Sequence, residues 1–377
     1  MTDADFIVVG GGVAGLSAAA ALVKHGRVVV LEAEDALGVH SSGRSATFSH
    51  YGIGNEAVRA LTAWSRERFA PGVAQRASAL FFATEDMLPR LDALEAEMGR
   101  FTDGLQRVGA ARMAELFPPL RTGPGAAIEG LNEPDGLRLD SDAMLQGYAR
   151  TVRAAGSAVL TGRRIVRAEP GWTVTCDTGE TYRAPVLVNA AGAWADGLAR
   201  LAGVAPLGLR PLRRTIIVVD PPAGADVRAW PFAKSAVDDF YILPESGRLA
   251  ASPTDEVESE ACDAQPEEYD LALAAWKVEA YTTLSVARIA HRWAGLRTFT
   301  ADRVPVAGFA PDAPGFFWLA GQGGYGLQTA PAMAAVAEGL ITGSAWPDGL
   351  HALGAGPAEI GIHRLSHKLR DSAQPLP

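Results

Sequence analysis

Cysteine is scarce in this sequence: Cys176 and Cys262 are the two cysteines of a 377-residue chain. Two are too few for a disulfide framework or a four-ligand metal cage, and neither has a sequence neighbour that would activate a thiolate. Long hydrophobic runs are also lacking. The apolar stretch at 13–31 is interrupted by Lys24 and Arg27, so it cannot span a bilayer and no transmembrane segment is expected.

Positive charge is in deficit, because 34 lysines and arginines face 43 aspartates and glutamates, for a net charge of −9. Nucleic-acid binding needs a basic stripe, so no nucleic-acid partner is expected. Asp3 and Asp5 precede the first apolar run, where a signal peptide would carry lysine or arginine, which predicts a cytoplasmic location. With 48% apolar and 20% charged residues, the composition indicates a globular protein of one large or two intertwined domains.

Glycine, in contrast, is concentrated near the start, in the segment FIVVGGGVAGLSAAAALVKHGRVVVLEAE at residues 6–34. Residues 6–9 form a short β-branched run that predicts a buried parallel strand. Gly10, Gly12 and Gly15 follow with the spacing G-x-G-x-x-G. The first permits a tight turn, the second lets the backbone approach a pyrophosphate, and the third lets helix and strand pack closely.

The residues after these glycines complete a strand–helix–strand unit. An alanine- and leucine-rich helix is predicted over 13–25, with Gly26 as its stop, and a second strand over 28–31. Glu32 ends that strand, where its carboxylate can accept hydrogen bonds from both ribose hydroxyls, which disfavours NADP. The free N–H groups at the helix start can bind the phosphates. A glycine-rich turn of some other α/β fold is the competing interpretation.

The loop that follows distinguishes NAD from FAD. In EAEDALGVHSSGRSATFSHYG, residues 32–52, small and hydroxylated side chains surround Arg44. Ser41, Ser42, Arg44 and Ser45 can donate hydrogen bonds to the pyrophosphate and ribityl chain of FAD. A polar loop with a helix cap is the alternative interpretation of this segment.

Two later segments repeat the order of strand, small-residue turn and helix. They are APVLVNAAGAWADGLARLAG at 184–203 and GFFWLAGQGGYGLQTAPAMAAVAEGLITG at 315–343. The start of the second helix could face the negative edge of a reduced flavin and stabilise it electrostatically. Such turns near both ends of the chain predict a cofactor domain that is assembled from distant segments.

The blocks HGRVVVLE, HSSGRSA, LVNAAGAWAD, LAGVAPLGL, FYILPESG, WAGLRTF and GQGGYGLQT run almost from end to end. In these blocks the chain resembles the D-amino-acid-oxidase-like (DAO) family of FAD-dependent amine dehydrogenases and oxidases, and within it the D-arginine dehydrogenases. The resemblance implies an α/β fold, with a Rossmann-like FAD domain of glutathione-reductase type interleaved with a smaller α+β substrate domain on a mixed sheet. The FAD domain is expected at 1–75, 140–208 and 296–377, and the substrate domain at 76–139 and 209–295.

The substrate-domain assignment also has support in the residues themselves. RRTIIVVD (213–220), FYILP (240–244) and RLAASP (248–253) predict strands, and the acidic segment 255–270 predicts a solvated loop. The segment PEEYDLALAAWKVEAYTTL (266–284) predicts an amphipathic helix.

The resemblance further implies which residues hold the FAD, which is expected without a covalent link although some relatives attach flavin through a histidine near His40. The residues expected around it are Gly10, Gly12, Ala14, Gly15, Glu32, Ala33, Ser41, Ser42, Gly43, Arg44, Ser45, Ala46, Arg164, Ala191, Gly192, Gly323, Gly324, Tyr325, Gly326, Leu327, Gln328 and Thr329.

By the same resemblance, hydride passes from the α-carbon of a neutral amine to flavin N5, and water hydrolyses the imine that results. Arg297 is expected to clamp the substrate carboxylate, for which a guanidinium has the best geometry, and Tyr241 to donate a hydrogen bond to it. Arg214 and Gly324 match the same site. Only one of Arg213 and Arg214 can face it, because adjacent strand residues point to opposite faces. An interdomain salt bridge for Arg297 and a core position for Tyr241 are the alternatives.

Departures from the arginine-specific branch bear on substrate choice. Phe48 and Ile53 stand where that branch has a histidine and a lid tyrosine, and its guanidinium-binding glutamate aligns near Ala79. Lys234 falls at an apolar pocket position, and His50 lies on the lid loop. If both face the pocket, an anionic or polar side chain is favoured over arginine, so D-aspartate or D-glutamate should be oxidised better. A Lys234 that reaches solvent is the alternative.

The electron acceptor is left open between quinone, dye and oxygen. Leu249 aligns with a lysine that promotes oxygen reduction in sarcosine-oxidase-type relatives, which favours a dehydrogenase, although Lys234 could take that lysine's place. Three alternatives to a D-amino-acid enzyme remain: a glycine- or sarcosine-oxidase-like amine oxidase, a 2-hydroxy-acid dehydrogenase with His50 as its base, and a flavoprotein scaffold without activity.

Overall fold

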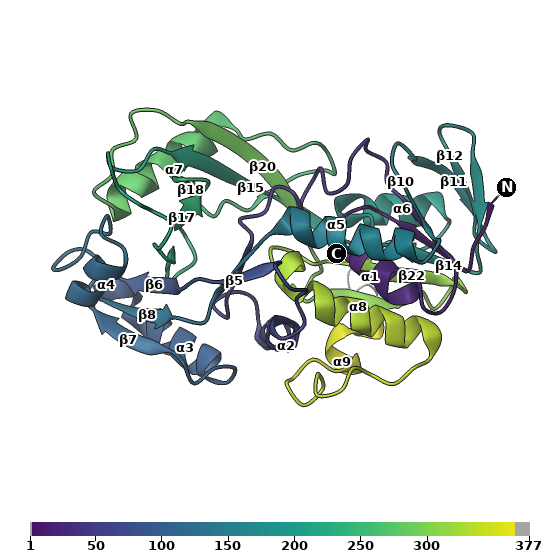
Figure 1. Ribbon diagram of the computed structural model, residues 1–377, viewed down its shortest axis with the longest axis horizontal. Helices are drawn as coiled ribbons and strands as arrows, with labels where there is room; N and C mark the ends of the chain where they lie inside the picture. Colours follow the sequence, from purple (N-terminus) through teal and green to yellow (C-terminus); the bar gives the residue numbers. More distant parts are fainter. Residues whose placement is uncertain (1, 366–377) are drawn as a thin grey trace, which may run out of the picture.

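The computed structural model describes residues 2–365, and two large sheets dominate it (Figure 1). A six-stranded sheet lies on the side where Figure 1 marks the start of the chain, and a nine-stranded sheet lies toward the opposite end. Between them in this view are a helix and a small three-stranded sheet: α2 (Glu56–Arg66), β4 (Phe48–Ser49), β9 (Leu137–Leu139) and β5 (Ala74–Arg76).

The six-stranded sheet is the dinucleotide-binding type of sheet that the glycine motif predicts. Its order is β10 (Ala158–Leu160), β3 (Val28–Leu31), β2 (Phe6–Val9), β14 (Val186–Asn189), β22 (Phe316–Ala320) and β21 (Val306–Phe309). The first five strands are parallel and β21 is antiparallel. Strands of a parallel sheet are covered on both faces, which explains their nearly continuous valine, leucine and phenylalanine.

Alternate residues of these strands pack into two different cores. Val8 and Val30 face α1 (Val13–Leu22), α5 (Ser141–Ala154) and α8 (Gly326–Thr342). Ile7 and Leu31 face the other side, toward α6 (Ala195–Leu201) and a four-stranded sheet. That sheet has the order β1 (Thr2–Asp3), β13 (Thr181–Arg183), β12 (Thr173–Cys176) and β11 (Ile165–Glu169).

The nine-stranded sheet is mixed. Its order is β19 (Val257–Glu258), β15 (Arg210–Val219), β18 (Arg248–Ser252), β17 (Tyr241–Glu245), β16 (Phe232–Ser235), β6 (Ala79–Ala83), β8 (Glu129–Glu133) and β7 (Gln106–Gly109), with β20 (His291–Phe299) also paired to β15. Only the β16–β6 pairing among these strands is parallel.

The two faces of this sheet have different roles. One packs on α7 (Glu268–Tyr281) and α4 (Ala110–Leu116), and Leu249 and Ile242 belong to that core. The other face carries Phe232, Tyr241 and Ile216 and continues onto α3 (Leu88–Gly99). Short elements complete the fold: η1 (Glu85–Met87), η2 (Gly192–Trp194) and α9 (Pro357–Ile360).

The predicted α/β fold class is confirmed, with two local corrections. The helix predicted over 13–25 ends at Leu22, and residues 23–25 form a turn. The segment 255–270 is not a loop throughout, because β19 lies within it and α7 begins at Glu268.

The predicted domain boundaries stay a proposal. Support for them comes from sheet membership, because the strands of the six-stranded sheet lie within 1–75, 140–208 and 296–377. Those of the nine-stranded sheet lie within 76–139 and 209–295, except that β20 crosses the last boundary. Of the helices in residues 2–365, none has the length and apolar character needed to cross a bilayer.

Candidate functional site

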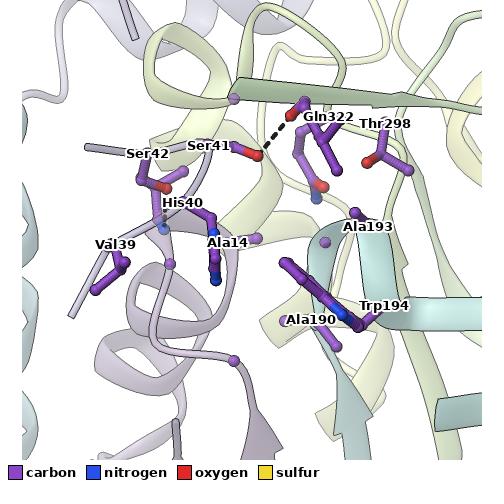
Figure 2. A pocket seen from close by; sticks show the side chains of 18 of the residues that line it. Ala14, Val39, His40, Ser41, Ser42, Ala190, Ala193, Trp194, Thr298 and Gln322 are labelled. Atoms are coloured by element: carbon purple, nitrogen blue, oxygen red, sulfur yellow. Dashed lines mark hydrogen bonds between the residues drawn. The ribbon is translucent and has the colours of Figure 1, made fainter. Parts of the chain in front are cut away.

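A large cavity opens at the carboxyl ends of the parallel strands, where α/β sheets bind their ligands. Its volume is about 420 Å³, within the range of small-molecule sites. The loops after β2, β3, β14 and β22 form its wall, with β20 on the far side. Figure 2 shows Ser41, Ser42, Thr298 and Gln322 toward its upper side and Trp194 with Ala190 and Ala193 at the lower right.

The three motif glycines have different tasks in this cavity. Gly10 has a φ of +114°, and a Cβ on it would lie 2.3 Å from the carbonyl oxygen of Ala190. A Cβ on Gly15 would lie 2.0 Å from the Gly10 oxygen, so Gly15 serves the packing of α1 on β2 and does not line the cavity. Gly12 is on the wall, where a Cβ would meet Ser42 Oγ at 3.2 Å. The glycine motif therefore forms a turn in which backbone atoms of Gly10 and Gly12 face the cavity at close range.

Glu32 is held rigidly at the end of β3. Its Oε2 accepts a hydrogen bond from the Gly11 N–H at 2.6 Å, and its Oε1 accepts one from the Glu34 N–H at 2.8 Å. A carboxylate oxygen can accept two hydrogen bonds, so each oxygen keeps capacity toward the cavity. This is the arrangement that a vicinal diol such as a ribose requires.

The loop after Glu32 is fixed from both sides of the cavity. Ser42 Oγ accepts the Val13 N–H at 3.0 Å, and Ser41 Oγ donates to the Leu296 carbonyl at 2.5 Å. The ring of His40 packs on that of Trp194 with their centroids 4.5 Å apart. The loop thus connects the start of α1 with β20.

Arg44 lines the cavity, but its guanidinium has other partners than the expected cofactor contacts. It donates to the carbonyls of Val39, Ala264 and Ala294 at 2.9–3.0 Å and pairs with the Asp263 carboxylate. With four of its five N–H donors engaged in this way, Arg44 fastens the loop to the nine-stranded sheet. The expectation that its side chain also donates to a pyrophosphate stays a prediction, for which one N–H remains.

Most residues predicted to hold the cofactor share the cavity wall: Gly10, Gly12, Ala14, Glu32, Ala33, Ser41, Ser42, Arg44, Ser45, Ala46, Arg164, Ala191, Gly192, Gly323, Gly324, Gly326 and Leu327. Five do not: Gly15, Gly43, Tyr325, Gln328 and Thr329. Gly43 closes a turn by donating to the Gly38 carbonyl. The Tyr325 hydroxyl donates to the Arg303 carbonyl, and that of Thr329 donates to the Tyr325 carbonyl, so both side chains are used within the protein.

The wall also has polar atoms that lack a partner within the described residues. Thr298 Oγ1 and Gln322 Nε2 are buried and make no hydrogen bond there. Unpaired buried polar groups are costly, so a ligand that pairs with them would stabilise the site. With the glycine turn and the fixed Glu32 carboxylate, these residues fit a bound FAD.

A smaller inner chamber adjoins the cofactor cavity. Its free volume is about 30 Å³, and Ser45, Ala46, Arg214, Arg297 and Gly324 line both spaces. The remaining lining residues are Thr47, Phe48, His50, Ile53, Phe232, Lys234, Asp238, Tyr241 and Gln328. The predicted substrate residues therefore line one chamber, with Arg214, Arg297 and Gly324 at its junction with the cofactor cavity.

The pair Arg213 and Arg214 divides between the two sheet faces, as predicted. Arg213 pairs with Glu267 and, at 2.9 Å, with the buried Asp270 on α7. Arg214 faces the chamber and donates from Nε to the Asp255 carbonyl at 2.8 Å. Burial, and then the nearby charge of Arg297, lower the pKa of Arg214 to about 10.

Arg297 has no carboxylate within 4.0 Å among residues 2–365. The Tyr241 hydroxyl is buried and likewise lacks a hydrogen-bond partner in that part of the chain. A site with two guanidinium groups and an unpaired hydroxyl is suited to an anion, and planar carboxylates match a guanidinium best.

The opposite wall of the chamber is aromatic and contains one ion pair. Phe232 stacks on Phe48 and on His50 with centroids 5.1 and 4.8 Å apart. Lys234 is 4% exposed and pairs with Asp238 at 2.9 Å. Lys234 therefore faces the chamber and does not reach solvent. Burial, and then the charge of Lys234, lower the pKa of His50 well below its usual value, so this imidazole is neutral.

One alignment-based expectation is wrong, and a second aligned position lies outside both cavities. Leu249 lies opposite Pro244 in the β17–β18 pair and packs toward α7, on the face away from Tyr241. It therefore cannot occupy a position beside the cofactor. Ala79 is fully buried in β6 and lines neither cavity.

Sequence reasoning missed Asp238, Thr298, Gln322, Phe232 and Trp194. Asp238 has a φ of +59° in the turn between β16 and β17, a conformation that aspartate and asparagine tolerate better than most residues. The two adjacent aspartates of VDDFY, four residues after Lys234, were the available signal. No local pattern marks the others. Within residues 2–365, no cluster of three or more metal-binding side chains is found.

The fold and the site define a dinucleotide-binding protein with a cationic chamber that opens into its cofactor cavity. Residues 5–339 match the family DAO, FAD dependent oxidoreductase, and the chain belongs to that family, whose cofactor is FAD.

Similarity to individual proteins is more distant. An uncharacterized oxidoreductase of Bacillus subtilis is 26% identical over 250 residues, 63% of each chain. The chain thus spans somewhat less than two thirds of that relative. The L-α-glycerophosphate oxidase of Mycoplasma pneumoniae has a similar fold, with a TM-score of 0.82 and 18% identity over 91% of this chain and 95% of that one. The glycine oxidase of Bacillus cereus superposes with a TM-score of 0.78 and 17% identity over 92% and 99%.

Proposed function

We propose that this protein catalyses the FAD-dependent oxidation of the Cα–N bond of a D-amino acid or a related N-substituted amino acid. The products would be an imine, which water hydrolyses to a 2-oxo acid, and reduced cofactor. Bound FAD supplies the acceptor for the hydride. One observation carries the proposal: Arg297 and Arg214 lie where the inner chamber meets the cofactor cavity, and the unpaired Tyr241 hydroxyl belongs to the same chamber.

These three residues would bind the substrate carboxylate. Arg297 can donate two parallel N–H···O bonds to it, and the Tyr241 hydroxyl can donate a third. Arg214 adds a positive charge but keeps its Nε on the Asp255 carbonyl. A carboxylate held at this junction directs the α-carbon toward the cofactor cavity, which is the orientation that hydride transfer requires.

The aromatic wall and the lid loop would exclude water while the substrate is bound. Phe48 and His50 stand on the loop that covers the chamber, and both pack against Phe232. The substrate amine enters the reaction in its neutral form, and the neutral His50 can accept a hydrogen bond from it, because burial and nearby cations lower the pKa of His50 and disfavour its protonation. The Nδ1 atom of His50 is buried and unpaired within the described residues, which leaves it available for this contact.

A 2-hydroxy acid is a second candidate substrate. It would use the same carboxylate contacts, and the unpaired His50 Nδ1 could accept its hydroxyl proton. The similar fold of an oxidase named for L-α-glycerophosphate, a hydroxyl compound, gives this candidate some support. A glycine- or sarcosine-type amine oxidase and an inactive flavoprotein scaffold remain further alternatives.

The D configuration and the likeness to D-arginine dehydrogenases are predictions from the resemblance, and the cytoplasmic location is a prediction from the acidic residues before the first apolar run. The argument for a dehydrogenase over an oxidase fails, because it placed Leu249 beside the cofactor. Quinone, dye and oxygen are all retained as acceptors.

The test is anaerobic reduction of the holoenzyme by D-, L- and N-methyl amino acids and by 2-hydroxy acids. The proposal predicts that the visible absorbance of bound flavin bleaches with an amino acid of the D or N-substituted series. Bleaching by hydroxy acids alone would move the assignment to the second candidate. No bleaching by any of them would indicate a scaffold.

A further inference from the structure

The proposed function assigns no role to Lys234, although this buried lysine lines the inner chamber. It lies directly opposite Tyr241 in the β16–β17 pair, so both side chains project from the same sheet face. Its ammonium is therefore a close neighbour of the hydroxyl that the proposed function gives to the substrate. Phe232, two residues earlier on the same face, lines the chamber beside it.

The hydrogen bonds of Lys234 leave one donor available. Its Nζ donates to the Gly52 carbonyl at 3.0 Å and pairs with Asp238 at 2.9 Å. An ammonium has three N–H donors, and Lys234 is buried and lines the chamber. The third N–H of Lys234 is therefore available to a ligand in the chamber. Burying a lysine to this extent costs free energy unless its ammonium is paired. A ligand that pairs with the ammonium would therefore stabilise the protein substantially.

The charges that face the chamber point to a ligand with two acid groups. Arg214, Arg297 and Lys234 are cationic, and Asp238 is the one carboxylate that lines the chamber within the described residues. A single carboxylate on Arg297 leaves one positive charge unmatched.

Two further carboxylates lie near Arg214 but have partners of their own. Glu256 forms a two-bond ion pair with Arg303 and reaches Arg214 only at 3.4 Å. Asp255 accepts hydrogen bonds from the backbone N–H and the hydroxyl of Thr215 at 2.8–3.0 Å. Neither side chain lines the chamber.

We infer that Lys234 is a specificity-determining residue that binds a second carboxylate, so that the substrate is a short amino dicarboxylic acid. The inference rests on the proposed function and names its substrate class. The Asp238 carboxylate offsets part of the cost of burying the ammonium, and its half-exposed position at the chamber edge leaves the inner N–H to the substrate. The small chamber favours a short connection between the two acid groups, as in aspartate, glutamate and N-carboxymethylglycine.

The test uses acids and their uncharged counterparts of nearly equal shape. D-Aspartate is compared with D-asparagine, D-glutamate with D-glutamine, and N-carboxymethylglycine with N-methylglycine, by kcat/KM for reduction of an artificial dye. The first two pairs place the second acid on the side chain, and the third places it on nitrogen. The inference predicts that the acid is preferred in at least one pair by roughly 10-fold or more, the effect of one hydrogen bond to a charged group.

The substitution Lys234→Met should lower that acid-to-neutral ratio by roughly 10- to 100-fold. Lys277→Met is the matched control, because Lys277 is also mostly buried and pairs with Asp239 in the same turn, yet it lies on α7, across the sheet. That control should keep the ratio of the wild-type protein. A preference for the neutral compound in all three pairs, or an equal loss in Lys277→Met, would overturn the inference.

Binding of unreactive acids separates this inference from the proposed function. Glutarate and butyrate are titrated into wild-type holoenzyme, and the visible spectrum of bound flavin and the thermal midpoint are followed. Tighter binding of glutarate supports the second carboxylate site even if no amino acid is oxidised. Equal binding of glutarate and butyrate contradicts the second carboxylate site. Because this titration uses wild-type protein, it decides the question even if Lys234→Met does not fold.

Discussion

Arg214 and Arg297 stand on adjacent strands, β15 and β20, and both line the cofactor cavity and the inner chamber. Arg214 is 5% exposed, and the charge of Arg297 helps to lower its pKa. Two guanidinium groups in this position repel one another, and a bound anion would offset the repulsion. Their shared position at the junction is therefore the feature around which substrate binding is organised.

Replacing Arg297 with methionine should remove the main carboxylate contact. We expect KM to rise and kcat/KM to fall by about 100-fold, the equivalent of losing one charged, bidentate hydrogen-bonding group. Steady-state kinetics with the best substrate of the panel measure this. Arg292→Met, an exposed position on the same strand, is the control and should behave as wild type. An unchanged KM in Arg297→Met would show that Arg297 does not bind the substrate carboxylate.

Arg213→Met and Arg214→Met should differ although the residues are adjacent. Arg213→Met leaves the buried Asp270 without its partner and should lower the free energy of unfolding by about 3 kcal/mol. Arg214→Met should change stability much less, because the Glu256 carboxylate, 3.4 Å from Arg214, keeps Arg303 as a partner, but should weaken substrate binding. Thermal midpoints at saturating FAD and KM values for both variants test the pair. Reversed effects would mean that the strand faces are misassigned.

Glu32→Gln should weaken FAD binding. Its two carboxylate oxygens accept the N–H groups of Gly11 and Glu34, and an amide NH₂ would face one of these donors. We expect the Kd for FAD to rise by roughly 10- to 100-fold, measured by titrating apoprotein with FAD. Glu169→Gln, in the surface pair with Arg167, should have no effect. Unchanged FAD affinity in Glu32→Gln would exclude Glu32 as the ribose ligand.

His50 should give stability a specific pH dependence. Burial lowers its pKa in the folded protein, so below pH 6.5 the unfolded state takes up a proton that the folded state does not. The contribution of His50 to the free energy of unfolding is constant above pH 6.5 and decreases as the pH falls below 6.5. His50→Phe should reduce the loss of unfolding free energy on acidification by up to about 1.4 kcal/mol per pH unit. Denaturant unfolding at constant FAD measures how the free energy of unfolding changes with pH in the wild-type protein and in His50→Phe. The same change in both proteins would contradict a neutral, buried His50.

The fold was largely predictable because its signals are local. The glycine spacing at 10–15, the valine runs and the Glu32 position are properties of short segments, and they determine a strand–helix–strand unit by sterics and burial. The alternation that separates Arg213 from Arg214 is local in the same sense, and the structure places only Arg214 in the chamber.

The remaining features depend on contacts between distant segments. The anchoring of Arg44 could not be predicted because its partners, the carbonyls of Ala264 and Ala294, lie more than 200 residues away. Leu249 was misplaced because a shift of one residue in strand register exchanges the two faces of a sheet. Asp238 was missed because the aspartate pair of VDDFY does not by itself show that the turn has the positive φ that brings Asp238 to Lys234.

The most direct test of the account compares an amino acid with its own α-amide. The best D-amino acid of the panel and the corresponding α-carboxamide are mixed anaerobically with holoenzyme, and the visible absorbance of the bound flavin is followed. Complete bleaching by the acid and none by the amide is the predicted result, because Arg297, Arg214 and Tyr241 bind a carboxylate. Equal bleaching by the amide would contradict the claim that this cluster holds the substrate.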